Sequence, residues 1–364
     1  MGPSARLGDG AENPRERVVH KPTRTENPKV AIIGAGMSGL VCAAELSARS
    51  ISVQVFEKSR GPGGRMSTRR VPALSNAADF DHGAQYFTAR APKFIEQVEQ
   101  WIAEGVVEAW QGRIVSINAD GVQPSRTGTP RFVGRPGMNA VCRRLVEGVD
   151  VRFDTRVAEL TRSAQQWRLS DPGGLRLGEF DLVVSTAPAP QTAALLKSAA
   201  PALATWVARA RMQPCWALLA AFDAGLPLEF DGAFVNQGPL SWIARSSSKP
   251  GRASAPERWI LHANPRWSEK HLEADPNDVV APLLDAFSTA TGNALPNPNW
   301  AVAHRWRYAL TDSPLNDGCL FDSTAGVGAC GDWANGNRVE GAFLSGRQMA
   351  LAIAEAYGLP SSEG

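Results

Sequence analysis

The chain has 364 residues, of which 38 are lysine or arginine and 36 are aspartate or glutamate, giving a formal net charge of +2. This near balance gives no reason to expect nucleic acid or an anionic membrane surface as a partner. The length suits one large two-domain protein or two modest domains, and it is ample for a substantial core.

The five cysteines are odd in number and scattered, which argues against a disulfide framework and against metal ligation. A reduced, cytoplasmic setting is therefore expected. Residues 1–28 are polar and contain no apolar core of a signal peptide, so we expect a disordered leader. No stretch approaches the roughly 20 apolar residues of a membrane span. Nothing in the sequence specifies an oligomeric state.

The first motif is an apolar run at residues 30–33, followed by a Gly-x-Gly-x-x-Gly loop that opens a helical pattern. Such a loop binds the phosphates of a dinucleotide at the N-terminus of the helix. Gly34 is expected to permit the tight turn, Gly36 to let the backbone approach a pyrophosphate, and Gly39 to let the helix pack closely on the strand. The expected cofactor positions in this loop are Gly34, Gly36, Met37, Ser38 and Gly39.

A second apolar run at residues 53–56 ends at Glu57. An acid roughly 20 residues past the glycines is expected to bond ribose hydroxyls and to disfavour a 2′-phosphate. The alternative is an ordinary glycine turn followed by a surface glutamate. Strand, loop, helix, strand and acid occur in order, and this order favours a dinucleotide-binding unit.

A second glycine-rich stretch runs from Lys58 to Arg70. Bare glycine backbone suits a chain that passes beside a large buried cofactor. The stretch resembles the Arg-x-Gly-Gly-Arg signature of the flavin amine oxidase superfamily, whose members bind FAD. The alternative is a basic surface turn. The resemblance implies FAD contacts, with the two arginines at the pyrophosphate or flavin, from Lys58, Arg60, Gly64, Arg65 and Met66.

The next motif, Asp-x-Gly-Ala-Gln-Tyr at residues 81–86, follows Gly-Gly-Arg-Met-x-Thr. Together these runs resemble the renalases, and the flanking sequence resembles their bacterial relatives. The resemblance implies that Gln85 and Tyr86 reach toward the flavin, although Tyr86 is equally suited to the core. We interpret His82 as a structural or hydrogen-bonding histidine rather than a catalytic one.

The middle of the chain is predicted to return to the cofactor domain. Residues 92–104 form an amphipathic helical pattern. Residues 149–153 and Val157 predict a strand, with residues 166–169 as its hairpin partner, and the resemblance implies that the Val157 backbone touches the adenine side. Residues 181–188 predict a buried parallel strand that ends in small residues beside the cofactor.

Residues 210–300 are predicted to form an antiparallel sheet with a helix at 278–290. If residues 302–308 form a strand, His304, Trp306 and Tyr308 share one face. An aromatic stripe beside a flavin is suited to stack a planar heterocyclic substrate, and ordinary core packing is the equal alternative. Lys249 lies in a polar loop, where we expect a surface residue rather than the flavin-adjacent lysine of amine oxidases.

The C-terminal part carries a second cofactor signal, a predicted strand that ends at Gly331-Asp332 and a small-residue helix that follows. In flavoproteins with two dinucleotide motifs, the aspartate bonds the ribityl or pyrophosphate region and the helix N-terminus faces the flavin, where its partial charge stabilises an anion. A plain C-terminal docking helix is the alternative. The expected contacts are Gly331, Asp332, Val339, Glu340, Gly341 and Ala342.

Together these patterns predict an α/β fold: a Rossmann-type FAD-binding domain of the two-dinucleotide-motif flavoprotein class, interleaved with an α+β substrate domain on an antiparallel sheet. We expect residues 29–75, 132–208 and 301–364 in the FAD-binding domain and residues 76–131 and 209–300 in the substrate domain. The resemblance covers about residues 29–357.

The resemblance also implies an activity. Renalases oxidise dihydro-isomers of NAD or NADP, passing hydride to FAD and electrons to O2, and they release NAD(P)+ and hydrogen peroxide. A dihydropyridine needs no strong base, which agrees with the lack of a recognisable catalytic serine-histidine or cysteine-histidine arrangement. The alternatives are a flavin-containing amine oxidase, or a non-catalytic FAD- or NAD-binding protein. We expect non-covalent FAD, because neither Cys319 nor Cys330 lies in a Ser-Gly-Gly-Cys context.

Overall fold

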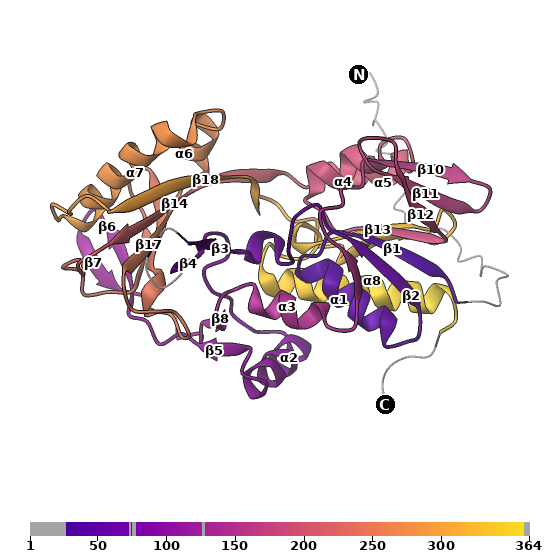
Figure 1. The fold of residues 1–364 in the computed structure, drawn as a ribbon, viewed down its shortest axis with the longest axis horizontal. Helices are drawn as coiled ribbons and strands as arrows, with labels where there is room; N and C mark the ends of the chain where they lie inside the picture. The colour runs from indigo at the N-terminus through magenta and orange to yellow at the C-terminus, as the bar shows by residue number, and fades with distance from the viewer. Residues whose placement is uncertain (1–26, 73, 75–77, 126–127, 360–364) are drawn as a thin grey trace, which may run out of the picture.

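Two large sheets organise the molecule, and the computed structural model describes them within residues 27–72, 74, 78–125 and 128–359. In Figure 1 the sheet around β1 lies at one end of the molecule and the sheet around β14 at the other, with the short β3–β4 hairpin between them. The expected leader at residues 1–28 lies almost wholly outside the described residues.

The first sheet has six strands in the order β19-β20-β13-β1-β2-β9. Only the β19–β20 pair is antiparallel, so the sheet has the parallel order with crossovers of a Rossmann-type domain. Its strands are β1 (Lys29–Ile33), β2 (Ser52–Phe56), β9 (Asp150–Arg152), β13 (Leu182–Ser185), β19 (Cys319–Asp322) and β20 (Val327–Cys330).

Both faces of this sheet are covered, which explains why its central strands are apolar throughout. Val30 and Ile32 of β1 pack with the helices on one face, which are α1 (Met37–Ser47), α3 (Ala140–Val146) and α8 (Val339–Ala356). Ala31 and Ile33 pack on the other face with α4 (Ala189–Leu196), α5 (Pro201–Val207) and a small sheet of β10 (Glu159–Ser163), β11 (Gln166–Ser170) and β12 (Arg176–Phe180).

The predicted hairpin partner of the 149–153 strand was wrong. Residues 166–169 lie in β11, which pairs antiparallel with β10 and β12, whereas β9 pairs in parallel with β2. The chain turns away after β9, where Thr155 N donates to Glu57 O at 2.9 Å. Only a short turn separates β10 from β11, so these two strands pair as a local hairpin, and β11 does not pair with β9. Val157 therefore lies in the connection between β9 and β10.

The second sheet has seven strands in the order β18-β14-β17-β16-β15-β6-β7, and every pair except β15–β6 is antiparallel. One face packs on the helices α6 (Pro265–Lys270) and α7 (Pro276–Thr291). The strands are β6 (Ile114–Asn118), β7 (Gly121–Pro124), β14 (Met212–Phe222), β15 (Gly232–Val235), β16 (Leu240–Arg245), β17 (Glu257–Ala263) and β18 (Trp300–Thr311).

The opposite face of the second sheet points toward the nucleotide-binding unit. On β14, Trp216 and Leu218 pack with α7, while Ala217 and Leu219 pack with Phe80 of the β3–β4 hairpin. The remaining elements that join the two sheets are β3 (Thr68–Val71), β4 (Ala78–Asp81), α2 (Pro92–Ala103), β5 (Val107–Ala109) and β8 (Phe132–Gly134).

The expected domain division at residue 301 needs correcting for β18. This strand pairs with β14 along almost its whole length, from Trp300 opposite Ala221 to Thr311 opposite Met212. It therefore belongs to the seven-stranded sheet, and the chain enters the nucleotide-binding unit only after it. A boundary chosen from the sequence could not show this, because sheet pairing is a long-range property.

Candidate active site

The first glycine loop has the steric arrangement that its pattern predicts. Gly34 has φ +115°, a conformation that L side chains rarely adopt, and a Cβ on Gly39 would lie 2.1 Å from Gly34 O. A Cβ on Gly36 would meet no atom within 4 Å, so this position faces open space. The fold itself therefore requires glycine at positions 34 and 39. At position 36 no protein atom requires glycine, and the open space there can admit a ligand.

The N-terminus of α1 opens beside this loop. Gly36 is its N-cap residue, no side chain caps the helix, and no acid lies in its first turn. The first backbone N–H groups of a helix have no partner within the helix, so the first turn at Met37 and Ser38 can donate to an anion. Ser38 Oγ points inward and donates to Cys330 Sγ at 3.2 Å.

Glu57, at the carboxyl end of β2, connects the two glycine loops. It is only 6% exposed, which excludes the alternative of a surface glutamate. Oε2 accepts from Ala35 N and Oε1 accepts from Ser59 N, both at 2.8 Å. A carboxylate has about four acceptor sites, so it retains capacity for ribose hydroxyls.

The second glycine stretch packs directly against the first loop. Gly63 N donates to Ala35 O at 2.9 Å, and a Cβ on Gly64 would lie 3.7 Å from the Gly36 Cα. The short 3-10 helix Gly64–Met66 follows, in which the Met66 side chain is buried and Arg65 is partly exposed. Lys58 and Arg60, the other expected contacts of this stretch, are exposed.

Arg65 and Asp332, far apart in the sequence, form a bidentate ion pair with distances of 2.8 and 2.6 Å. Arg65 also donates to Ala309 O of β18 at 3.1 Å. Asp332 follows β20 and Gly331, and it is 7% exposed. The pair joins the second glycine stretch to the C-terminal motif, beside the end of β18.

The α8 helix begins a few residues later and has an open N-terminus, since no side chain caps it. Glu340 in its first turn is directed elsewhere: Oε1 accepts from Arg90 N and Ala91 N, each at 2.7 Å, at the start of α2. A Cβ on Gly341 would lie 2.0 Å from Asn335 O, so close packing holds this helix start in place. The Val339 and Ala342 backbone lies in the same first turn.

Lys249 is buried, so its expected surface position was wrong. It is 2% exposed, Nζ donates to Gln85 Oε1 at 3.1 Å, and Nζ lies 3.7 Å from Asp81 Oδ2. The turn after β16 directs the side chain inward, a consequence of tertiary packing that a polar loop sequence does not reveal. Burial lowers the pKa of Lys249 to about 8, although Asp81 opposes the shift.

Asp81 lies at the centre of this buried cluster; the sequence identified it only as the first residue of the Asp-x-Gly-Ala-Gln-Tyr motif and predicted no role for it. Its carboxylate accepts from Arg252 at 2.5 Å, from Met138 N at 2.9 Å and from Thr68 Oγ1 at 2.8 Å. Burial raises the pKa of Asp81, but the charges of Arg252 and Lys249 outweigh it and hold the pKa below its ordinary value. The cluster ties the β3–β4 hairpin to the loop after β16.

His304 and Trp306 share a face of β18, as predicted, and they pack with His82. Their ring centroids lie 4.7 and 5.0 Å from that of His82, and Trp306 Nε1 donates to His82 O at 2.9 Å. Tyr308 lies within a register irregularity of the β14–β18 pairing, between Trp306 and Leu310, and among the described residues it joins none of these ring contacts. The interpretation of His82 as a packed histidine agrees with this geometry.

All three histidines of this region are held neutral. Burial lowers the pKa of His82 to about 3, with a further contribution from His304. Burial also lowers the pKa of His304 to about 4, helped by the charge of Arg69, and that of His262 to about 4. Ala217 of β14 lies opposite His304 on one side and His262 on the other, which puts the two imidazoles in one row across the sheet.

Tyr86 packs among aromatic side chains next to this cluster. Its ring lies 6.3 Å from Trp110 and 5.4 Å from Trp242, and the Arg131 guanidinium lies 5.3 Å from it. Gln85 is buried, donates to Asp81 O and Gly83 O, and accepts from Lys249. Both residues therefore have packing partners within the protein itself.

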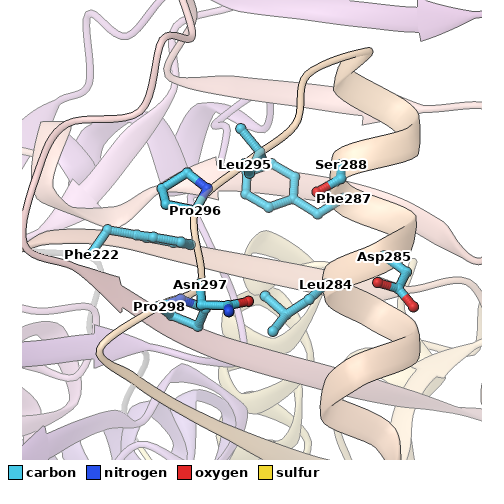
Figure 2. A pocket seen from close by; sticks show the side chains of 9 residues that line it. All are labelled: Phe222, Leu284, Asp285, Phe287, Ser288, Leu295, Pro296, Asn297 and Pro298. Carbon is cyan, nitrogen blue, oxygen red and sulfur yellow. The ribbon is translucent and has the colours of Figure 1, made fainter.

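One pocket lies away from all of these groups, between α7 and the loop that follows it (Figure 2). In Figure 1, α7 lies at the opposite end of the molecule from β1 and α1. The pocket holds none of the predicted site residues, and its lining is Phe222, Leu284, Asp285, Phe287, Ser288, Leu295, Pro296, Asn297 and Pro298.

The fold and the converging glycine loops define an FAD-dependent oxidoreductase. A model of the NAD(P)-binding Rossmann-like domain matches residues 32–101, and a model of the flavin containing amine oxidoreductase family matches residues 120–354. The second match covers more than half of the chain, and the chain therefore belongs to the flavin containing amine oxidoreductase family.

Solved structures show the same fold. The chain is similar to cyclohexylamine oxidase from Brevibacterium oxydans IH-35A, with a TM-score of 0.72 and 16% identity over 91% of this chain and 99% of that one. It is also similar to putrescine oxidase bound to putrescine, with a TM-score of 0.65 and 13% identity over 91% of this chain and 99% of that one. At these identities the likeness establishes the architecture.

One curated relative matches a short segment. The chain is 45% identical over 51 residues to a zeta-carotene-forming phytoene desaturase from Myxococcus xanthus, which is 14% of this chain and 10% of that protein. The match thus spans about a tenth of the relative's length. In residues 27–72, 74, 78–125 and 128–359, no helix is both long enough and apolar enough to cross a membrane.

FAD is the cofactor of this family, and the residues present fit it. Gly36 leaves an open cradle, two uncapped helix N-termini supply backbone donors, and buried Glu57 retains acceptor capacity. Arg65 and Asp332 meet where the second glycine stretch reaches the C-terminal motif. A positively charged guanidinium and free N–H groups suit a pyrophosphate, and a carboxylate suits hydroxyl groups.

Proposed function

We propose that this chain is an FAD-dependent oxidase that takes hydride from dihydro-isomers of NAD or NADP and releases NAD(P)+ and hydrogen peroxide. FAD, when bound, accepts the hydride and returns two electrons to O2. The small-molecule donor and O2 would be the only reactants, in a cytoplasmic setting. The cofactor contacts proposed are the two glycine loops, Glu57, the Val157 backbone, Asp332 and the start of α8.

The observation that carries this proposal is the charge around the aromatic wall formed by His82, His304 and Trp306. Burial is the main reason that the pKa of each histidine is lowered and both stay neutral, and the charge of Arg69 adds to this effect. Nearby, Lys249 and Arg252 share the single carboxylate of Asp81. The charged side chains named here thus carry more positive than negative charge, which disfavours an ammonium ion at the wall and favours a donor that carries phosphates.

In this reaction the side chains bind and orient the donor and do not take part in bond breaking. The nitrogen of a dihydropyridine supplies the electron density that expels hydride, so no side chain has to remove a proton from carbon. Trp306 stacks on His82 and His304 meets Trp306 edge-on, which forms an aromatic wall suited to pack against a planar ring, and burial of His82 limits access of water. Lys249, whose pKa burial lowers to about 8, is enclosed with Gln85 and Asp81 and has no proton to transfer in this reaction.

FAD is proposed to bind non-covalently. Cys330 Sγ is buried beneath the first turn of α1 and accepts from Ser38 Oγ, and burial raises its pKa to about 12. A thiol in this state is a poor nucleophile. Acid precipitation is expected to release the yellow chromophore into the supernatant, and colour retained in the pellet would contradict non-covalent binding.

An amine oxidase is the second candidate, and the buried Lys249 favours it. A lysine adjacent to the flavin is a feature of amine oxidases, and Lys249 is enclosed with Gln85 and Asp81 rather than exposed. The family and the fold are shared with cyclohexylamine and putrescine oxidases, so they do not separate the two candidates.

Anaerobic stopped-flow absorbance of the bound flavin separates them. We expect fast bleaching by 2-dihydro-NAD or 2-dihydro-NADP, and slow or no bleaching by benzylamine. The ordinary 4-dihydro isomer serves as the control for a non-specific reductant. Fast bleaching by benzylamine alone would assign the protein to the amine oxidases, and bleaching by none of these donors would refute the proposed substrate class.

A further inference from the structure

Arg69 occupies a distinctive place on the β3–β4 hairpin. It lies directly opposite Phe80 in the antiparallel pairing, so the two side chains project from the same face of the hairpin. Phe80 is fully buried and its ring lies 5.3 Å from that of Trp300, on the face of the seven-stranded sheet that carries His304 and Trp306. Arg69 is therefore directed toward the aromatic wall.

The charge of Arg69 has no carboxylate partner. Among the described residues no ion pair involves its guanidinium, and the side chain is exposed. By contrast, Arg65 pairs with Asp332 and Arg252 pairs with Asp81. Arg70 forms no ion pair among the described residues either, but it lies opposite Asp79 in the hairpin, and its charge lowers the pKa of that carboxyl group against the effect of burial. The charge of Arg69 nevertheless reaches His82 and His304, whose protonation it opposes.

We infer that Arg69 binds a phosphate of the dihydronicotinamide dinucleotide and so selects phosphorylated donors. This inference rests on the proposed function. A guanidinium offers a rigid fork of donors that matches phosphate oxygens, and an unpaired one loses no existing salt bridge when it binds an anion. Its position beside the aromatic wall lets one substrate contact both, with the ring on the wall and the phosphate at Arg69.

The test compares Arg69→Gln with Arg70→Gln, using two donors that share the same ring. The first donor is 2-dihydro-NAD, and the second is 2-dihydronicotinamide riboside, which has no phosphate. Arg70 is the matched control because it is adjacent and exposed but lies on the opposite face of β3. Flavin bleaching is followed anaerobically at pH 8, where the histidines are neutral with or without Arg69.

Arg69→Gln is expected to raise the half-saturating concentration of 2-dihydro-NAD on the order of tenfold, because a hydrogen bond to a charged group is lost. The riboside should be unaffected, and Arg70→Gln should resemble the parent with both donors. Added salt should weaken binding of the dinucleotide to the parent more than to Arg69→Gln. Arg69→Lys should restore part of the affinity, since it keeps the charge but loses the fork.

Two other outcomes would overturn the inference about Arg69, and a third would overturn the proposed function. Equal half-saturation of parent and Arg69→Gln with 2-dihydro-NAD would overturn the inference while leaving the proposed function intact. An equal loss with both donors would also overturn it, because Arg69 would then act through the ring-binding residues. If the parent flavin is bleached by neither donor, the proposed function itself fails.

Discussion

Two alanine substitutions in the first glycine loop should separate stability from cofactor binding: Gly39→Ala should destabilise the fold, and Gly36→Ala should weaken FAD binding. In Gly39→Ala the new Cβ would lie 2.1 Å from Gly34 O. That oxygen cannot retreat easily, because Gly34 N donates to Phe56 O at 2.8 Å and Thr186 Oγ1 donates to Gly34 O at 3.1 Å. Overpacking of this kind costs typically about 1–3 kcal/mol, and backbone contact favours the upper end.

Gly36→Ala adds the same methyl group where nothing lies within 4 Å, and Gly36 has an extended backbone with φ −85° and ψ −179°. Loss of the glycine N-cap destabilises the fold by about 0.5–1 kcal/mol. Alanine also reduces the conformational entropy of the unfolded chain, which stabilises the fold by about the same amount. The apoprotein should therefore keep its stability within about 1 kcal/mol. FAD binding should nevertheless be lost or much weakened, because the methyl group fills the open face of the loop.

The assay is a urea titration of each apoprotein, together with titration of FAD by quenching of its fluorescence. Gly39→Ala should unfold at clearly lower urea than the parent, and Gly36→Ala should unfold with the parent but fail to quench FAD. A Gly36→Ala apoprotein as unstable as Gly39→Ala, or one that binds FAD as tightly as the parent does, would contradict the open space assigned to Gly36.

Three further predictions concern buried polar groups. Glu57→Ala should weaken FAD binding on the order of tenfold to a hundredfold and also lower the urea midpoint of the apoprotein, because Ala35 N and Ser59 N lose their acceptor; unchanged FAD affinity would exclude Glu57 as the ribose ligand. The pKa of Lys249 is about 8 in the folded chain and 10.5 in the unfolded chain. Between these pH values the unfolded chain binds more protons, so the contribution of Lys249 makes the free energy of unfolding rise as the pH rises from 8 to 10.5. Lys249→Met should lack this rise, and parallel pH profiles of unfolding free energy for parent and variant would contradict the assigned burial. His262 has a pKa of about 4 against 6.5, so its contribution is lost as pH falls from 6.5 to 4, and His262→Gln should remove about 3 kcal/mol of that acid sensitivity in urea titrations.

Several elements were predictable from local patterns. The apolar run and glycines around Gly34 predicted β1, the turn and α1, because strand burial, left-handed backbone and close helix packing each restrict the residue at one position. The helix at 92–104 was confirmed as α2, since a 3.6-residue apolar period depends only on neighbours along the chain. Alternation along β18 likewise placed His304 and Trp306 together.

Other features depended on which strands meet. Residues 166–169 paired with β10 rather than with β9, and β18 joined the seven-stranded sheet, because pairing partners are chosen by the whole fold. Tyr308 lies within the register irregularity of the β14–β18 pairing and joins none of the ring contacts among the described residues, although its sequence spacing matched. In each case the local pattern gave the element and the tertiary structure gave its neighbours.

Residue types and spacing alone thus determined the dinucleotide loops, the cofactor class and the parallel sheet, because bare backbone and a buried acid are required wherever a dinucleotide lies on a strand end. Only the tertiary structure decided which charged side chains are buried and which carboxylates they pair with. Lys249 in a polar loop became fully enclosed with Asp81, while Arg69 in an equally polar strand stayed exposed and unpaired by any described carboxylate. The free energy of a charge depends on its burial and its partner, and both are set by segments distant in the chain.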